Sequence, residues 1–211
     1  MKKISILTGI TILILASLGC QSKPHPTVAS QSYVKQYGDI TIKVHYMSYD
    51  ELVAEHGSRG NPFIDYPSIL TQKDLLTFRL EITTGETSLE IVQKDINFTL
   101  GEVSADPVSE HILITLWDPY SESGSDRTRK FSTIRRYVSK GTLKATPEEP
   151  LDTYLVFAKK FPQTGKALLS LPISTDSGDY GIIDIDFLFT GESDLELDEE
   201  GNVKNTGIFS E

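Results

Sequence analysis

The clearest alternation of apolar and polar residues in the chain is Leu76-Thr77-Phe78-Arg79-Leu80-Glu81-Ile82. Successive side chains of a β-strand point to opposite faces, so the four apolar residues fall on one face and Thr77, Arg79 and Glu81 on the other. An apolar face opposite a polar one is typical of a strand that covers a core on one side and meets solvent on the other. The segment therefore predicts an antiparallel sheet with one buried face.

Other segments repeat this signal on both sides of residues 76–82. Strands are expected over 40–46, 89–92, 96–100, 154–157, 167–173 and 182–189. Residues 111–117 are nearly continuous in β-forming residues with apolar side chains on both sides, which predicts a central strand. Short strands separated by turns favour an all-β fold, an antiparallel immunoglobulin-like β-sandwich with one short inserted amphipathic helix.

Helical signals occur at two places. Ser48 precedes Glu51 at capping-box spacing and Gly57 follows as a stop, which predicts one or two helical turns over 49–56. Residues 127–144 have the second signal, because Phe131, Ile134, Tyr137 and Val138 would share one arc of a helix. The same segment is rich in basic residues: Arg127, Arg129, Lys130, Arg135, Arg136, Lys140 and Lys144.

Two interpretations of this basic segment stay open. It is either the solvated face of a helix whose charges pair with acidic neighbours, or a surface for a partner. The loop that contains Asn61-Pro62-Phe63 and Tyr66-Pro67 is likewise either pinned to the body or a recognition loop. The candidate partner-binding residues are Trp117, Tyr120, Arg127, Arg129, Arg135, Arg136, Asn61 and Phe63.

The first twenty residues have the pattern of an export signal that ends at the only cysteine. Lys2 and Lys3 give a cationic start, residues 4–18 are uncharged and mostly apolar, and Gly19 precedes Cys20. This apolar run of about 15 residues is shorter than the roughly 20 that span a bilayer as a helix. We therefore expect the signal to be cleaved.

The segment Ala16-Ser17-Leu18-Gly19-Cys20 resembles the lipobox of bacterial lipoproteins, although Ser17 stands where the strongest lipoboxes have leucine. The resemblance implies cleavage before Cys20, which then becomes the lipidated first residue. Two or more acyl chains hold a protein firmly on a membrane. Gln21, where some lipoproteins have aspartate, implies by the same resemblance the outer rather than the inner membrane of the cell envelope.

These features divide the chain into four parts. We expect a lipoprotein signal peptide (1–19), a lipidated N-terminus and flexible tether (20–37), a β-sandwich domain (38–191) and an acidic C-terminal tail (192–211). Loss of Lys2 and Lys3 with the signal moves the net charge from −10 to −12. A surface of this sign repels phosphate polymers, so nucleic acid is not an expected partner.

No sequence pattern for catalysis stands out. The chain has neither a phosphate-binding glycine loop nor a Gly-x-Ser-x-Gly motif. The sequence alone cannot bring together a serine–histidine–acid triad, because the histidines of the expected domain are scattered at His45, His56 and His111. We therefore predict no catalytic residue, no cofactor and no metal site.

The body of the chain resembles small bacterial envelope lipoproteins of unknown function that have such a sandwich. This resemblance rests on the strands within 76–100, on residues 154–157 and on the stretch 165–172. The expected function is that of a membrane-anchored, non-enzymatic binding or envelope-assembly module. Its partner would be another envelope protein or a wall component. Two alternatives remain: an envelope hydrolase acting on cell-wall or lipid material, and a structural surface antigen without a small-molecule ligand.

Overall fold

The computed structural model describes residues 26–58, 60–64, 74–121 and 123–191. Its larger sheet contains β1 (Thr27–Val28), β5 (Leu89–Val92), β6 (Asn97–Leu100), β7 (Val103–Ala105), β8 (Thr142–Ala145), β10 (Thr164–Thr175) and β11 (Tyr180–Gly191). The smaller sheet contains β2 (Ser32–Tyr37), β3 (Ile40–Tyr46), β4 (Asp74–Thr83) and β9 (Leu151–Lys159). The described helices are α1 (Tyr49–His56), α3 (Glu110–Trp117) and α4 (Gly124–Tyr137), with short 3-10 helices η1 (Gln93–Asp95) and η2 (Asp118–Tyr120).

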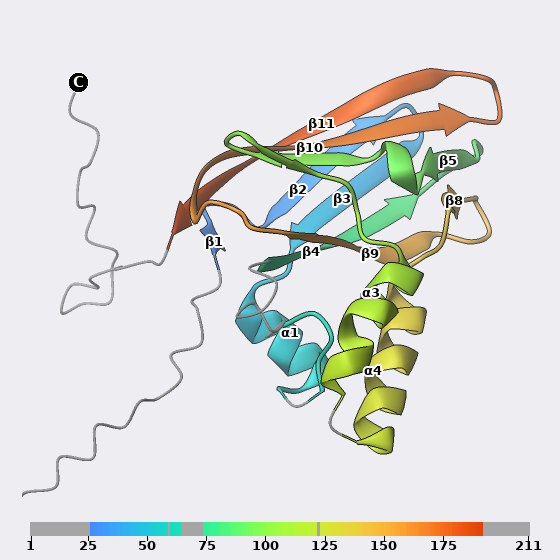
Figure 1. Ribbon diagram of the computed structural model, residues 1–211. Coiled ribbons are helices and arrows are strands. Elements are labelled where there is room, and N and C mark those ends of the chain that lie inside the picture. The colour runs from blue at the N-terminus through green and yellow to red at the C-terminus, as the bar shows by residue number, and fades with distance from the viewer. Residues whose placement is uncertain (1–25, 59, 65–73, 122, 192–211) are drawn as a thin grey trace, which may run out of the picture.

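The two sheets face each other, and the helices gather at one end of the molecule (Figure 1). The larger sheet has the order β1-β11-β10-β5-β8, with β6 and β7 attached beside β10, and the smaller sheet has the order β2-β3-β4-β9. All pairs between the described strands are antiparallel. The prediction of an all-β antiparallel sandwich is confirmed.

Strand β4 lies between β3 and β9 and shows the predicted alternation. Its pairing places Ile82 opposite Ile42 and Leu76 opposite Phe157. Arg79 and Glu81 remain partly exposed on the outer face. The fully buried side chains of the alternating stretch are Leu76, Phe78, Leu80 and Ile82. The alternation therefore sets which face of the sheet forms the core.

Aromatic rings from both sheets meet at the centre of this core. The ring of Phe78 on β4 lies 5.2 Å from that of Phe98 on β6 and 5.0 Å from that of Phe187 on β11, centroid to centroid. Phe157 on β9 lies 5.8 Å from Phe78 on the same sheet. These rings meet edge to face or tilted, which are favourable arrangements. Phe78 therefore links the two layers directly.

A second group of buried side chains lies between the smaller sheet and the helices. Strand β9 serves both groups, because Leu155 and Phe157 face the sandwich core, whereas Tyr154 and Val156 face the helices. The helices contribute Leu52, Leu113, Trp117, Phe131 and Ile134 to this second group. The helices thus form a partial third layer on the outer face of the smaller sheet.

Helix α1 begins and ends where the sequence predicts. The Ser48 hydroxyl accepts from the backbone N–H of Glu51 at 3.4 Å, and the Glu51 carboxylate accepts from the backbone N–H of Ser48 at 2.8 Å. Gly57 ends the helix at a φ of 77°, a conformation that favours glycine. The capping box therefore fixes where the helix leaves β3, which positions the site described below.

The prediction of a strand over 111–117 is wrong, because this segment is helix α3. Ser109 caps the helix by accepting from the N–H of Ile112, and the buried Leu113 and Trp117 lie four residues apart on one face. Ile112 is 52% exposed on another face. A run with apolar residues on several sides fits either a buried strand or a helix. The other two described α-helices, α1 and α4, lie where the sequence predicts helical segments.

The sandwich begins earlier than the sequence predicts. The expected tether over 20–37 includes β2, which pairs with β3 from Ser32 opposite His45 to Tyr37 opposite Ile40. Nearly all residues of this edge strand are exposed, so its composition is like that of a linker. The signal peptide, Cys20, Tyr66 and the tail over 192–211 lie outside the described residues. None of the described helices is long and apolar enough to cross a bilayer.

Candidate functional site

The basic segment forms helix α4 with the predicted faces. Phe131 and Ile134 are buried against the sheet, and so is Val138 directly after the helix. Arg129 and Arg136 are exposed on the opposite side. Lys140 and Lys144 lie beyond the helix, the latter on β8. The amphipathic helix is confirmed, although it ends before the last two basic residues.

Most of the basic side chains pair with acids. Arg135 and Lys140 both contact the buried carboxylate of Glu110, at 3.5 and 2.8 Å. Further pairs are Arg127–Asp118 at 2.6 Å, Arg129–Asp126 at 3.6 Å, Lys130–Asp126 at 3.1 Å and Lys144–Glu90, and Arg136 lies over the ring of Tyr137. This pairing agrees with the interpretation of the segment as a solvated helix face.

Three residues that we expected at a partner surface are instead buried, and the expectation needs correction for them. The Trp117 indole N–H donates to the Pro62 carbonyl at 2.8 Å, and the Asn61 side chain donates to the Leu52 carbonyl at 2.8 Å. Phe63 is fully buried. The described part of this loop, residues 60–64, is therefore pinned between the helices, as its other interpretation predicted.

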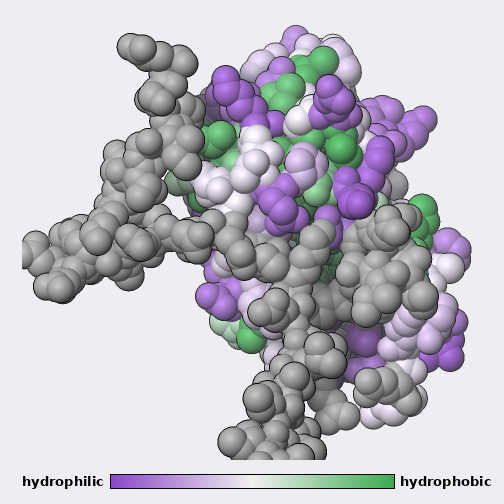
Figure 2. Space-filling view, turned by 60° about the vertical axis from the view of Figure 1, so that its left-hand side comes forward, coloured by the Kyte–Doolittle hydropathy of each residue, from purple (hydrophilic) through white to green (hydrophobic). Residues whose placement is uncertain are grey.

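Of the remaining expected residues, Tyr120 is half-buried and the four arginines, Arg127, Arg129, Arg135 and Arg136, are exposed. The Arg129 guanidinium lies beside Gly60 of the loop, where a side chain on Gly60 would clash with it. Large exposed apolar side chains are distributed over several elements, such as Val34 on β2 and Ile182 on β11. Figure 2 shows hydrophilic and hydrophobic residues interspersed on one face.

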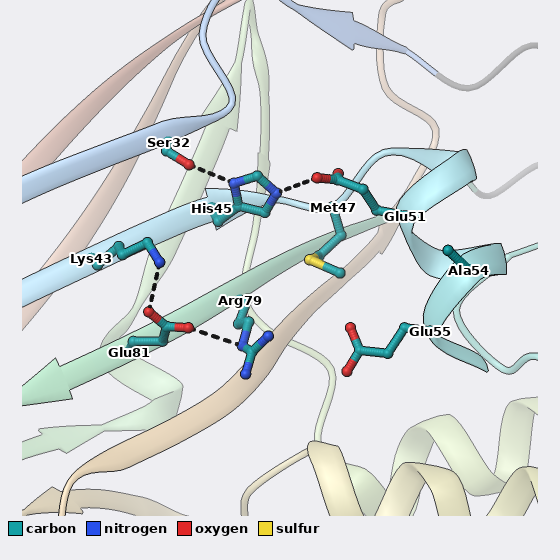
Figure 3. A pocket seen from close by; sticks show the side chains of 9 residues that line it. All are labelled: Ser32, Lys43, His45, Met47, Glu51, Ala54, Glu55, Arg79 and Glu81. Carbon is teal, nitrogen blue, oxygen red and sulfur yellow. Dashed lines mark hydrogen bonds and ion pairs between the residues drawn. The ribbon is translucent and has the colours of Figure 1, made fainter.

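An open pocket lies on the outer face of the smaller sheet, beside α1 (Figure 3). Its volume is about 560 Å³. Strand and helix residues line it together: Ser32, Lys43, His45, Met47, Glu51, Ala54, Glu55, Arg79 and Glu81. Six of these nine side chains are ionisable, which suits a polar ligand. Within the described residues, no His, Cys, Asp and Glu side chains cluster in a way that could hold a metal ion.

Strand register places the polar residues of the pocket floor. Lys43 lies opposite Glu81 and His45 opposite Arg79 in the β3–β4 pair. The Lys43 ammonium contacts Glu81 at 2.9 Å, and the Arg79 guanidinium contacts Glu81 at 3.2 Å and Asp152 at 2.6 Å. These contacts form a polar network on the outer face, opposite the core. The network holds the two cations of the pocket in place.

A chain of hydrogen bonds crosses the pocket wall (Figure 3). Ser32 Oγ lies 2.6 Å from His45 Nδ1, and His45 Nε2 lies 2.8 Å from Glu51 Oε1. The other carboxylate oxygen of Glu51 accepts from the backbone N–H of Ser48 at 2.8 Å and from its hydroxyl at 2.7 Å. Burial raises the pKa of Glu51, but the hydrogen bonds from Ser48 and His45 outweigh it, so the pKa lies below its ordinary value. Glu51 is therefore an anion at neutral pH.

The second acid of α1 in the pocket, Glu55, has a different environment. The two pocket cations pair with Glu81 and Asp152 and not with Glu55. Glu55 instead contacts Tyr154: burial raises the pKa of the Tyr154 phenol, and its hydrogen bond to Glu55 adds to this effect. His56 Nε2 lies 3.2 Å from the same phenol oxygen, and burial lowers the pKa of His56. Glu55 thus presents negative charge to the pocket.

The pocket was not predicted from the sequence. Ser32 lies in the expected tether, and His45 is one of three histidines that are far apart in the sequence. Two available signals pointed toward it, namely the alternation over 40–46, which puts His45 on the outer face, and the capping box at Ser48. The cross-strand pairing that brings Ser32 to His45 has no local signal in the sequence.

Comparison with known proteins shows structural likeness only. No protein-family description and no characterised protein matches the chain. One similar solved structure is the Northeast Structural Genomics Consortium target SoR45, at 13% identity and a TM-score of 0.40 over 77% of this chain and 95% of that one. Another is a DUF4426 family protein from Pseudomonas aeruginosa PAO1, at 6% identity and a TM-score of 0.34 over 77% of this chain and 97% of that one. Neither description names an activity or a ligand.

Proposed function

We propose that this chain is a lipid-anchored protein of the bacterial envelope whose sandwich acts as a binding or assembly module. The anchor follows from the lipobox resemblance at Cys20. The binding role is supported by one observation, the open pocket beside α1 with its six ionisable side chains. Ligand sites are concave and have a few convergent polar groups that fix orientation. Most charges of α4 already have acidic partners, so the pocket replaces α4 as the proposed surface.

The charges of the pocket favour a ligand that carries an amine. Three carboxylates, those of Glu51, Glu55 and Glu81, line it against the two cations Lys43 and Arg79. Both cations are already in contact with acids, whereas Glu55 contacts a phenol. Arg79 interacts electrostatically with Glu55, but three carboxylates against two cations leave an excess of negative charge that an incoming ammonium group would offset. Wall peptides and other envelope proteins present such amines, which fits a module confined to the envelope.

The test is photo-crosslinking in intact cells. A photoreactive amino acid replaces Ala54, an exposed residue that lines the pocket, and the matched control carries it at Ser132, which is exposed on α4. We expect a defined adduct from position 54, weakened by Glu55→Gln, and none from position 132. Adducts from position 132 alone would make α4 the interface. Adducts from neither position would favour a structural surface protein.

A further inference from the structure

The hydrogen-bond chain in the pocket has the order of a catalytic triad: hydroxyl, imidazole, carboxylate. We propose that Ser32, His45 and Glu51 form a nucleophile, general base and orienting acid that hydrolyse a carboxylic ester in this pocket. This inference depends on the proposed use of the pocket as a ligand site and adds a reaction to it. The two hydrogen bonds of 2.6 and 2.8 Å are within the range that links a nucleophile to its base and the base to its partner.

The tautomer of the neutral His45 imidazole follows from its hydrogen-bond partners. An ionised carboxylate accepts hydrogen bonds and donates none, so the contact with Glu51 requires the proton on Nε2. In the neutral imidazole, Nδ1 then has a free lone pair, and it faces the Ser32 hydroxyl. This is the arrangement for removing a proton from Ser32. The two ring nitrogens are exchanged relative to trypsin-like proteases, but geometry and roles define a triad.

Three consecutive elements hold the three groups. The β2–β3 register puts Ser32 opposite His45, and α1 begins directly after β3. Glu51 is held by two hydrogen bonds from Ser48, so its orientation toward His45 does not depend on ligand. The His45 side chain is 21% exposed and Ser32 is exposed, so a ligand reaches the hydroxyl from the open side. The groups are thus preorganised and accessible.

A positive charge lies on the same face of the sheet. Lys43 stands two residues before His45 on β3, so both side chains point into the pocket (Figure 3). Its side chain is 45% exposed and contacts Glu81. Because Glu81 already offsets the charge of this ammonium, we assign Lys43 no role in stabilising negative charge on the attacked carbonyl oxygen.

The reaction balances without a cofactor. Ser32 Oγ attacks the ester carbonyl carbon while its proton passes to His45 Nδ1. The tetrahedral intermediate collapses, the carbon–oxygen bond to the alcohol breaks, and the alcohol leaves with the proton from His45. Water then attacks the acyl-Ser32 ester and gives a proton to His45. The carboxylic acid leaves as Ser32 recovers its proton, and the products are one acid and one alcohol.

The walls of the pocket limit the substrate class. The apolar lining residues are Met47 and Ala54, and the other seven are polar or charged. A long acyl chain would find little apolar surface to cover it, so its burial would contribute little. The pocket therefore suits esters with a short acyl group on a polar alcohol.

The test combines a covalent probe with a simple substrate. The purified chain is treated with a fluorophosphonate, which labels activated serine hydroxyls, and the modified peptide is identified by mass spectrometry. Hydrolysis of p-nitrophenyl acetate is followed in parallel. Ser32→Ala and His45→Gln are compared with Ser132→Ala, which removes an exposed hydroxyl on α4. Circular dichroism confirms that each variant is folded.

We expect the label on Ser32, loss of labelling and of hydrolysis in Ser32→Ala, and a fall of about 100-fold or more in both rates in His45→Gln. Ser132→Ala should match the parent chain. No label on Ser32 in the folded chain, or equal labelling of several serines, would overturn the triad. If Ser32 is not labelled but position 54 still crosslinks to a partner, the proposed ester hydrolysis is wrong and the proposed binding role is supported. If labelling occurs without crosslinking, the proposed amine-bearing ligand is wrong and the triad stands.

Discussion

Replacement of Phe78 tests whether the sandwich and its helical layer fold as one unit. Phe78 is fully buried, and its ring meets those of Tyr46, Phe98, Phe157 and Phe187 at centroid distances of 5.0 to 5.8 Å. Truncation of a buried phenylalanine to alanine costs about 3–5 kcal/mol of unfolding free energy. Aromatic pairs each add about 0.5–1.5 kcal/mol beyond burial, so we expect the upper end of that range.

This loss is large compared with the roughly 5–15 kcal/mol that stabilises a typical domain. Phe78→Ala should therefore shift the urea midpoint strongly, and Phe78→Leu, which keeps most of the side-chain volume, should cost about 1.5 kcal/mol or less. The exposed Val34 on β2 provides the control, since Val34→Ala should change stability by less than about 0.5 kcal/mol.

The assay uses two probes in one titration. Far-UV circular dichroism follows the whole chain, and fluorescence follows Trp117, the only tryptophan, which belongs to the helical layer. Strand β9 contributes to both groups of buried residues, so both transitions should move together in Phe78→Leu. A cost below about 1 kcal/mol for Phe78→Ala would refute the packing argument. If the urea midpoint of the Trp117 fluorescence were unchanged in Phe78→Leu, the two layers would not unfold as one unit.

Three further predictions concern single residues. Trp117→Phe removes the donor to the Pro62 carbonyl and should lower the unfolding free energy by about 1–3 kcal/mol in urea titrations, more than an exposed Ile112→Val change. Burial lowers the pKa of His56 below its ordinary 6.5, so below pH 6.5 the unfolded chain binds a proton that the folded chain does not. The free energy of unfolding should therefore decrease as the pH falls from 6.5 to the lowered pKa. The urea midpoint measured against pH tests this, and its decrease should be smaller in His56→Gln. Cys20→Ala should abolish incorporation of labelled palmitate and release the chain from membranes, and a variant that still takes up the label would contradict the anchor.

Much of the fold could be predicted because it depends on local pattern. Period-two alternation identified β3, β4 and β11, since one face of each meets the core and the other is at least partly exposed, although the helices cover the first half of β4 on its outer face. The capping box at Ser48 and Glu51 identified α1 through contacts within a single turn. Local pattern failed at α3, where apolar residues on several sides conceal the period, and at β2, where an exposed edge strand has the composition of a linker.

The sequence by itself determined the alternating strands, the helical face of α4 and the expectation of an anchor at Cys20, because each depends on neighbours in the chain. Tertiary structure alone decided which charges are paired and where a ligand has room. The acid that neutralises Arg135 is Glu110, 25 positions earlier, and β2 meets β3 to bring Ser32 to His45. Such contacts depend on strand register and layer packing, which residue order specifies only through the whole fold.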